Sequence, residues 1–324
     1  MAIVMHDVAD ALRRARVQDP DSLQLVDAAT LAGQYYPLFD PSTATLVVNL
    51  DGADRGRLQK VLLQAYPETH EVKLVAEAAQ AVRLADLAAE TGGTALYVPP
   101  LPYPGSFSAL QNISARLRAP DGCPWDRELT WEKLRPFLLE ETYELLAALD
   151  VADARKVLEE EGDLLLQISL QAQIATEEGD YRFPEVVARI VDKLIRRHPH
   201  VFGEVAVSGT DEVLANWEAI KAEERVKNGE KRSPLAGIPP GLPALAQAEA
   251  YLDRMSRLRP AAPPATPWAP LTHLAQDKPL TPELLGQVLF DLVAWAMARG
   301  VESESALREA NARFAAEVAG QDWG

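Results

Sequence analysis

The spacing of apolar residues predicts a small α/β region at the start of the chain. Two apolar runs bounded by turn residues, 43–50 and 94–101, predict strands, and 70–77 predicts a weaker third strand. Residues 55–67, between the first run and this third one, have the apolar spacing of a helix. We therefore predict a small α/β domain over residues 1–100.

From residue 106 onward the apolar residues recur at helical spacing, and one helix follows another. Thr130 and Asp153 stand where an N-cap is expected, and Pro184 suits the first turn of a helix. The pattern predicts a mainly α protein with a helical bundle over residues 106–226. The expected helices of this bundle are 106–120, 130–149, 154–178, 184–199 and 210–226.

The tail, residues 244–320, is similar to a degenerate copy of the middle of the chain. The stretch PELLGQVLFDLVAWAMARG aligns on its first glycine with LEEEGDLLLQISLQAQIATEEG. In this alignment Leu284 matches Glu160. Gln287 matches Asp163, so the apolar pattern persists while the acids are lost. We expect tail helices at 244–258, 282–299 and 303–318, and an extended Pro/Ala-rich segment at 259–270.

Composition and charge narrow the classes of function. The chain has 324 residues, 48% of them hydrophobic and 25% charged, which is typical of a soluble globular protein of about two domains. The net charge of −16 argues against a general nucleic-acid or membrane-surface binder, because both need a positive field. Cys123 is the only cysteine, and the N-terminus lacks the pattern of a signal peptide. With no apolar run of about 18 residues, we expect a cytoplasmic protein without a membrane partner.

Acidic residues on two consecutive predicted helices carry the candidate chemistry. Glu141 and Glu144, in FLLEETYELL, are three residues apart, so both carboxylates share one helical face. Glu160 and Asp163 repeat this spacing on the next helix. Each pair is centred 9.5 residues from a turn near residue 152. An antiparallel hairpin would therefore bring the four carboxylates to one height, about 14 Å from the turn.

Four converging carboxylates repel one another unless protons or a cation neutralise them. A set of ligands made only of oxygen favours hard divalent cations, Mg²⁺ first and Mn²⁺ second. The alternative is that these acids lie on an ordinary solvated face, as in many glutamate-rich helices.

Basic residues on the same and later helices form the second candidate feature. In a chain of net charge −16, cations gathered beside an acidic metal site favour a metal-bound polyphosphate. The alternatives are salt bridges between neighbouring helical turns, such as Asp192 with Arg196, and a core position for Trp217. The cations are Lys156, Lys193, Arg196, Arg197 and Lys221, and Trp217 lies four residues before Lys221.

Four separated stretches closely resemble the MazG family of nucleoside triphosphate pyrophosphohydrolases, in the order that the family has them. They are GCPWDRELTWEKLRPFLLEETYELLAALD, LEEEGDLLLQISLQAQIA, DKLIRRHPHVFG and NWEAIKAEE, and the match covers about residues 106–226. The resemblance implies an all-α NTP-PPase fold, Mg²⁺ dependence and a homodimer. It also implies hydrolysis of NTP or dNTP to the monophosphate and pyrophosphate, as in house-cleaning of the nucleotide pool.

The resemblance also implies roles for individual residues. The family pattern EExxE…ExxD binds metal through its acids, which implies metal ligation by Glu141, Glu144, Glu160 and Asp163, with Glu140 as a fifth catalytic acid. Glu161 stands where the family usually has an apolar residue, and we expect it to face solvent. Substrate handling is implied for Lys156, Lys193, Arg197, Trp217 and Lys221, and Arg196 joins them through its place on the basic face.

Two further expectations concern the rest of the molecule. Residues 1–100 more weakly resemble the C-terminal half of a tetrapyrrole methylase domain, through LQLVDAATLA and LYVPPLPYPGSF. The glycine-rich S-adenosylmethionine loop of that domain has no counterpart, so we expect a remnant rather than a methyltransferase. The alternatives to general NTP hydrolysis are a dimeric nucleotide-binding scaffold or regulator, and a narrower dUTP or dCTP pyrophosphatase.

Overall fold

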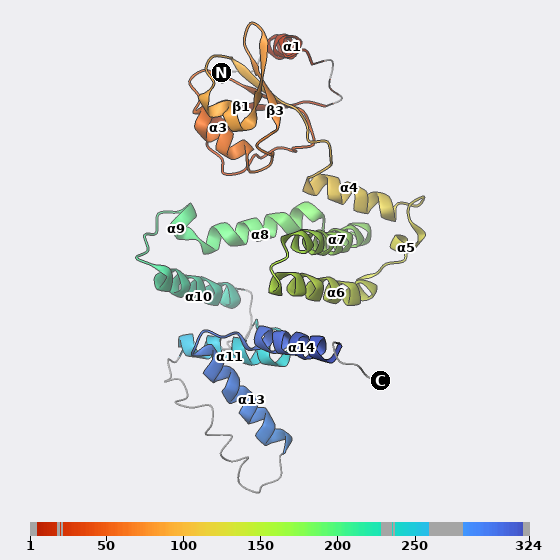
Figure 1. The fold of residues 1–324 in the computed structure, drawn as a ribbon, viewed down its shortest axis with the longest axis vertical. Helices are drawn as coiled ribbons and strands as arrows, with labels where there is room; N and C mark the ends of the chain where they lie inside the picture. Colours follow the sequence, from red (N-terminus) through yellow and green to blue (C-terminus); the bar gives the residue numbers. More distant parts are fainter. Residues whose placement is uncertain are drawn as a thin grey trace. The chain divides into compact units, whose positions relative to one another are not determined.

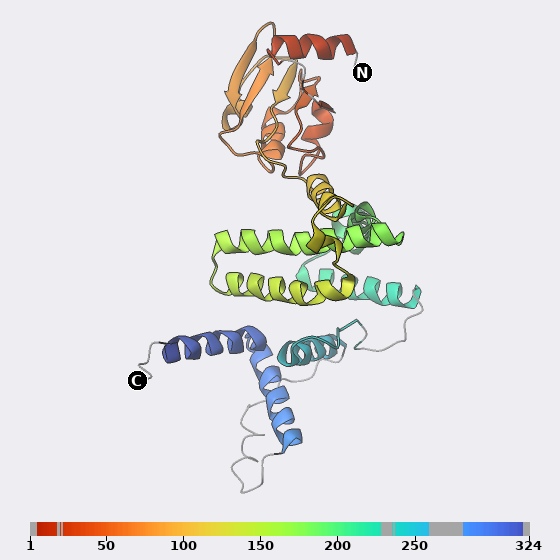
Figure 2. The same cartoon turned by 90° about the vertical axis from the view of Figure 1, so that its right-hand side faces the viewer.

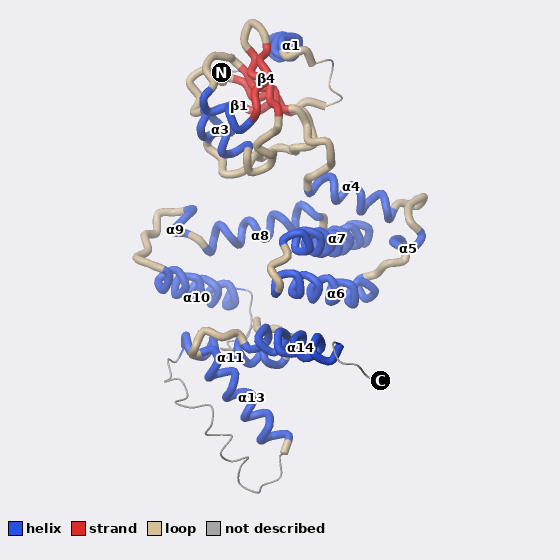
Figure 3. Tube along the Cα trace, viewed as in Figure 1, coloured by secondary structure: helices blue, strands red, loops and turns tan. Residues whose placement is uncertain are grey.

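The computed structural model confirms a mainly helical protein with one small sheet near its N-terminal end (Figure 3). The chain forms two compact units, and helices α6 and α7 each pass through both. The first unit comprises Met1–Glu141 and Glu161–Phe183, and the second comprises Thr142–Glu160 and Pro184–Gly324. The structure describes residues 5–17, 20, 22–227, 235, 237–258 and 281–319, so the predicted segment 259–270 lies outside the described residues.

Figure 1 shows the small sheet at the N-terminal end of the chain. It has five strands in the order β1-β2-β5-β3-β4, with β1 parallel to β2 and the other pairs antiparallel. The three predicted strands are present, but β1 and β4 were not expected, and neither was helix α1. The strands are β1 Gln24–Asp27, β2 Thr45–Val48, β3 Glu71–Val75, β4 Ala79–Arg83 and β5 Ala95–Val98. The helices of this region are α1 Met5–Arg14, α2 Ala28–Ala32, α3 Arg55–Leu62 and the 3-10 helix η1 Leu84–Ala89.

Apolar side chains that alternate along the strands cover both faces of the sheet. On β5, Leu96 belongs to one buried cluster and its neighbour Tyr97 to the other, as expected for side chains that point to opposite faces. Helices α2, α3 and η1 contribute to the first cluster, for example through Leu58, and α1 contributes Val8 to the second. The α/β region, from α1 to β5, therefore encloses a core of its own.

The helices that follow largely match the predicted bounds. Thr130 accepts a hydrogen bond from the Lys133 N–H (3.3 Å) at the start of α6, and Asp153 accepts from the Lys156 N–H (3.2 Å) at the start of α7. The loop between α4 and α6 holds the unexpected helix α5, which begins at a proline. The remaining helices are α4 Phe107–Arg118, α5 Pro124–Arg127, α6 Trp131–Asp150, α7 Ala154–Glu178, α8 Phe183–Arg197, α9 Pro199–Phe202, α10 Thr210–Lys227, α11 Ala244–Leu258, α13 Pro282–Met297 and α14 Ser303–Ala319.

Helices α6 and α7 form an antiparallel hairpin (Figure 2). Within the first unit, Leu134 of α6 packs with Leu170 and Ile174 of α7 in a small buried cluster. At the closed end Ala152 adopts a positive φ of 53°, and the Asp153 N–H donates to the Ala148 carbonyl (3.1 Å). This left-handed turn ends α6 and reverses the chain, so the hairpin holds the two acid-bearing helices side by side.

In the second unit, helices α11, α13 and α14 contact one another. Arg308 of α14 donates to both carboxylate oxygens of Asp150, at 3.0 and 3.1 Å, which ties the tail to the end of α6. Among the described residues, no helix combines the length and apolar content that crossing a membrane requires.

Candidate metal and phosphate site

The α6–α7 hairpin gathers three of the predicted acids. One carboxylate oxygen from each of Glu141, Glu144 and Glu160 lies within 4.8 Å of the others. Glu141 and Glu144 come from one face of α6, and Glu160 comes from the first two turns of α7. Glu141 and Glu160 are partly buried, whereas Glu144 is exposed. Oxygen ligands spaced in this way suit a divalent cation that bridges the two helices.

Two of the predicted acids stand outside this group. Asp163 is partly buried on α7, one turn beyond Glu160, but its carboxylate is not among the gathered oxygens. An aspartate side chain is one methylene shorter than glutamate, so it reaches less far across the helix interface. Glu140 is exposed and is also outside the group. The metal and catalytic roles of both residues stay predictions.

A cavity of about 690 Å³ in the second unit collects the basic residues. Seven cationic side chains and two carboxylates line it, together with Gly237. This local excess of positive charge contrasts with the net charge of −16 of the whole chain. The cations are Arg189, Lys193, Arg196 and Arg197 of α8, Lys221 and Lys227 of α10, and Arg254 of α11; the carboxylates are Asp192 and Glu224.

The carboxylates of this basic cavity are paired with arginines. Glu224 accepts from Arg197 Nη2 (2.6 Å) and lies 2.8 Å from Arg196 Nη1. The hydrogen bond from Arg197 lowers the pKa of Glu224; burial opposes this effect, and the charges of Arg197, Arg196 and Lys193 add to it. Asp192 lies 3.6 Å from Arg196, so the salt bridge that was the alternative explanation for this pair is present.

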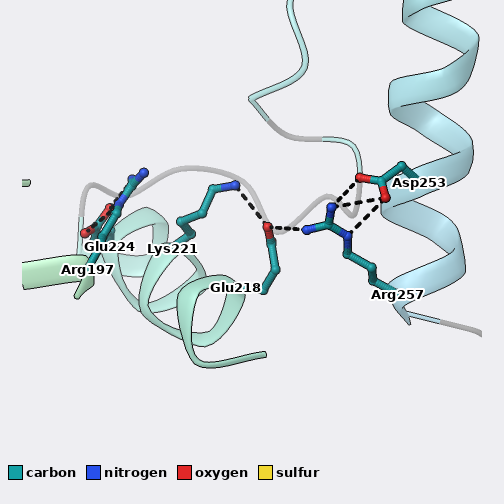
Figure 4. A network of polar contacts seen from close by, with 6 residues as sticks. All are labelled: Arg197, Glu218, Lys221, Glu224, Asp253 and Arg257. Carbon is teal, nitrogen blue, oxygen red and sulfur yellow. Dashed lines mark hydrogen bonds and ion pairs between the residues drawn. The ribbon is translucent and has the colours of Figure 1, made fainter. Parts of the chain in front are cut away.

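A third carboxylate, Glu218, pairs with cations of α10 and α11 next to this basic cavity (Figure 4). It accepts from Lys221 Nζ (3.0 Å) and from Arg257 Nη1 of α11 (3.4 Å). Arg257 also donates to Asp253, one turn earlier on its own helix. Burial raises the pKa of Glu218, but the hydrogen bond from Lys221 and the neighbouring positive charges outweigh burial, so the net shift is downward. Glu218 is therefore an anionic link between two helices.

Trp217 has cations over its ring. Lys221 Nζ lies 4.5 Å from the ring centroid, and the guanidinium carbon of Arg197 lies 5.6 Å from it. Its indole Nε1 is buried without a hydrogen-bond partner among the described residues. Such cation–π contacts hold two cavity cations in position, and a direct contact between Trp217 and the substrate base stays a prediction.

The predicted phosphate-binding residues divide into two groups. Lys193, Arg196, Arg197 and Lys221 line the basic cavity, whereas Lys156 is exposed in the first turn of α7 and does not line it. Sequence reasoning missed Arg189, Lys227 and Arg254. Arg189 lies four residues before Lys193, and helical spacing alone could have added it to the basic face.

Comparison with known proteins identifies the helical part of the chain. Residues 129–202 match the MazG nucleotide pyrophosphohydrolase domain. An uncharacterized protein of Bacillus subtilis (strain 168), YabN, is 38% identical over 244 residues, which cover 71% of this chain and 49% of that protein. The nucleoside triphosphate pyrophosphohydrolase of Escherichia coli (strain K12) is 38% identical over 224 residues, or 63% of this chain and 82% of the relative.

A third relative, the nucleoside triphosphate pyrophosphohydrolase/pyrophosphatase MazG of Thermotoga maritima, is 38% identical over 215 residues, covering 64% of this chain and 82% of the relative. The chain thus spans about half the length of the Bacillus protein and more than four fifths of the other two. The comparisons confirm the resemblance seen in the four motifs and leave the methylase-like remnant a prediction. On this breadth of similarity, the chain belongs to the MazG family of nucleotide pyrophosphohydrolases.

Proposed function

We propose that this protein is a Mg²⁺-dependent hydrolase that converts NTP or dNTP and water to the nucleoside monophosphate and pyrophosphate. The observation that carries the proposal is the convergence of Glu141, Glu144 and Glu160 on one hairpin, within 4.8 Å of one another. The names of the E. coli and Thermotoga relatives support the reaction.

The residues present suit a hard divalent cation, because all the gathered ligand atoms are carboxylate oxygens. Glu141, Glu144 and Glu160 would hold the ion, and Asp163 is proposed as a fourth ligand from the next turn of α7. Mn²⁺ prefers the same ligands and is a candidate substitute. A magnesium ion in such a site supplies Lewis-acid polarisation of the phosphorus–oxygen bonds.

The protein residues would do the remaining work. Glu140 is proposed to orient the attacking water and accept its proton. The water oxygen bonds to a phosphorus atom of the linkage between the α- and β-phosphoryl groups of the nucleotide. That linkage breaks, and pyrophosphate leaves. Lys193, Arg197 and Lys221 are proposed to neutralise the negative charge that moves toward the leaving pyrophosphate.

A homodimer is part of the proposal. Helix α8 is amphipathic, with its cations at the basic cavity and its apolar residues on the opposite face. The apolar residues stay between 45% and 48% exposed, so no described segment of the chain covers them fully. A second copy of the chain is the proposed cover, because large exposed apolar faces mark association surfaces. These residues are Ile190, Val191, Leu194 and Ile195.

House-cleaning of the nucleotide pool is the proposed physiological role, and the cytoplasmic location stays a prediction from the cysteine content. A panel of NTPs and dNTPs, assayed with Mg²⁺ for pyrophosphate release, tests the reaction. Turnover of several nucleotides supports the proposal. Turnover of dUTP or dCTP alone supports the narrower enzyme, and saturable nucleotide binding without turnover supports the scaffold.

The metal assignment is tested by Glu144→Gln. We expect pyrophosphate release to fall about a thousandfold, because losing a metal ligand removes roughly 4 kcal/mol of transition-state stabilisation. Glu161→Gln is the matched control, since Glu161 is exposed on α7 and outside the acidic group, and it should keep wild-type rates. Full activity in Glu144→Gln would remove the metal assignment.

A further inference from the structure

The basic cavity has a wall that the middle of the chain does not supply. Helices α8 and α10 provide six of its cations, and the seventh, Arg254, comes from α11. Helix α11 belongs to the tail, which was expected to be a degenerate repeat without chemistry of its own. The tail therefore contributes a charged residue to the region where the proposed function places substrate phosphates.

Helix α11 is joined to α10 by an ion pair next to the basic cavity. Arg257 Nη1 lies 3.4 Å from Glu218 Oε1, and that same oxygen accepts from Lys221 Nζ at 3.0 Å (Figure 4). The two basic residues belong to α11 and α10, so a single carboxylate oxygen bridges the two helices. Lys221 lines the cavity, and this bridge therefore fixes α11 beside it.

Arg254 shares the face of α11 that carries Arg257, because the two residues are three positions apart on one helix. It lines the basic cavity and also a second cavity, of about 450 Å³, lined by Leu214 and Glu218 among others. The positive charge of Arg254 is one of the causes that lower the pKa of Glu218. Arg254 thus stands at the junction of α10, α11 and both cavities.

The charge balance of the basic cavity favours an anionic ligand. Both of its carboxylates already pair with arginines: Glu224 with Arg196 and Arg197, and Asp192 with Arg196. The seven cations outnumber these two carboxylates and repel one another. A polyphosphate would relieve this repulsion, and arginine is well suited to bind it through two parallel hydrogen bonds.

We propose that Arg254 is a substrate-binding residue that holds the polyphosphate of the nucleotide, so that helix α11 of the tail completes the phosphate site. This inference rests on the proposed function for its choice of ligand. It gives the tail a direct part in substrate binding although its own acids are lost. The competing explanation is that Arg254 only helps to hold α11 in place beside Glu218.

Titration calorimetry with inorganic tripolyphosphate tests the assignment. The full chain is kept in EDTA, so that the acidic hairpin binds no metal and the basic residues alone take the ligand. We expect Arg254→Gln to weaken binding about tenfold, as for the loss of a charge-assisted hydrogen bond. Arg254→Lys should recover part of the loss, because it restores the charge without the bidentate geometry.

Arg313→Gln is the matched control. Arg313 is exposed on α14, pairs with Glu309 (3.4 Å) and does not line the basic cavity, so the same loss of charge there should leave the dissociation constant unchanged. The unfolding midpoint of each variant without ligand reports whether the helices still pack. A shift in that midpoint for Arg254→Gln, with unchanged tripolyphosphate affinity, assigns Arg254 to holding α11 and overturns the proposal.

The remaining outcomes separate this inference from the proposed function. Equal weakening by Arg254→Gln and Arg313→Gln overturns the assignment, because it shows only a general charge effect. Absence of tripolyphosphate binding by the wild-type chain overturns it as well. A tenfold loss in Arg254→Gln supports the assignment even if no nucleotide is hydrolysed, whereas hydrolysis with unchanged binding in Arg254→Gln retains the proposed function and removes the role of Arg254.

Discussion

The central strands of the α/β region bury their apolar residues, whereas helix α8 leaves apolar residues half exposed. In the α/β region Leu58, Leu96 and Val98 are fully buried, and both faces of the sheet are covered. On α8, Leu194 and Ile195 keep nearly half of their surface exposed. The opposite face of α8 carries the cations of the basic cavity, so this helix has one charged face and one apolar face.

This difference indicates where stability and function reside. A sheet whose two faces are both covered can be stable without a partner, and its buried residues are explained by packing alone. An exposed apolar face of this kind is typical of surfaces that bind other molecules. The expected phosphate site and the expected dimer surface therefore fall on the same helix, and each can be tested by itself.

The largest effect should come from a cavity in the α/β core. Leu96→Ala, on the central strand β5, should destabilise the α/β region by about 2–5 kcal/mol, whereas Leu194→Ala on α8 should cost less than about 1 kcal/mol. Hydrogen exchange of amides in the strand region 43–50 reports on the sheet. All six tryptophans lie outside residues 1–100, so tryptophan fluorescence reports on the rest of the chain.

We expect Leu96→Ala to speed exchange in the sheet while the tryptophan transition in urea stays in place. An equal shift of the tryptophan transition would show that the α/β region unfolds together with the helices, and that its stability does not depend on its own core alone.

The sequence predicted the helices best where their ends are determined by local residues. Helix α7 has the predicted bounds, 154–178, because Asp153 caps its start. Strands β1 and β4 were missed for the opposite reason. The β4 sequence AQAVR has little intrinsic strand preference, and it becomes a strand by pairing along its whole length with β3.

The candidate site shows the same division between local and distant information. The convergence of Glu141, Glu144 and Glu160 follows from spacing around one turn, which a sequence displays directly. The position of Arg254 could not be predicted, because it depends on contacts between helices that are far apart in the chain. The Arg257–Glu218 pair, for example, joins residues 39 positions apart.

The next effect concerns the exposed face of α8. Leu194→Glu should weaken the proposed dimer roughly 100-fold, because a twofold interface would bury the new charge twice. Leu38→Glu is the control, since Leu38 is 81% exposed in the α/β region and should not affect assembly. Sedimentation equilibrium measures both variants, and tripolyphosphate binding should survive in each, because the cations occupy the other face of α8.

A wild-type chain that sediments as a monomer would remove the second copy from the proposed function. The exposed apolar face of α8 would then have no proposed partner, and its difference from the buried strands of the α/β region would have no explanation.

The smallest expected effect is a pH dependence of the basic cavity. The hydrogen bond from Arg197 holds the pKa of Glu224 below its ordinary value of 4.5, against the opposing effect of burial. A carboxyl whose pKa is lower in the folded state stabilises the fold above its unfolded pKa, and this contribution is lost as the pH falls through the folded value. Glu224→Gln should therefore destabilise the helices by about 1 kcal/mol at pH 7, and by less below pH 4.5.

Urea unfolding followed by tryptophan fluorescence at pH 7 and at about pH 4 measures this difference, and Glu223→Gln, at an exposed neighbouring position, is the matched control. A difference between Glu224→Gln and wild type that is the same at both pH values would mean that the Arg197–Glu224 pair adds no electrostatic stability. The cations of the cavity would then be held by the helices themselves. In that case the basic cavity would resemble the α/β region, because packing of the helices, and not attraction between charges, would hold its side chains in place.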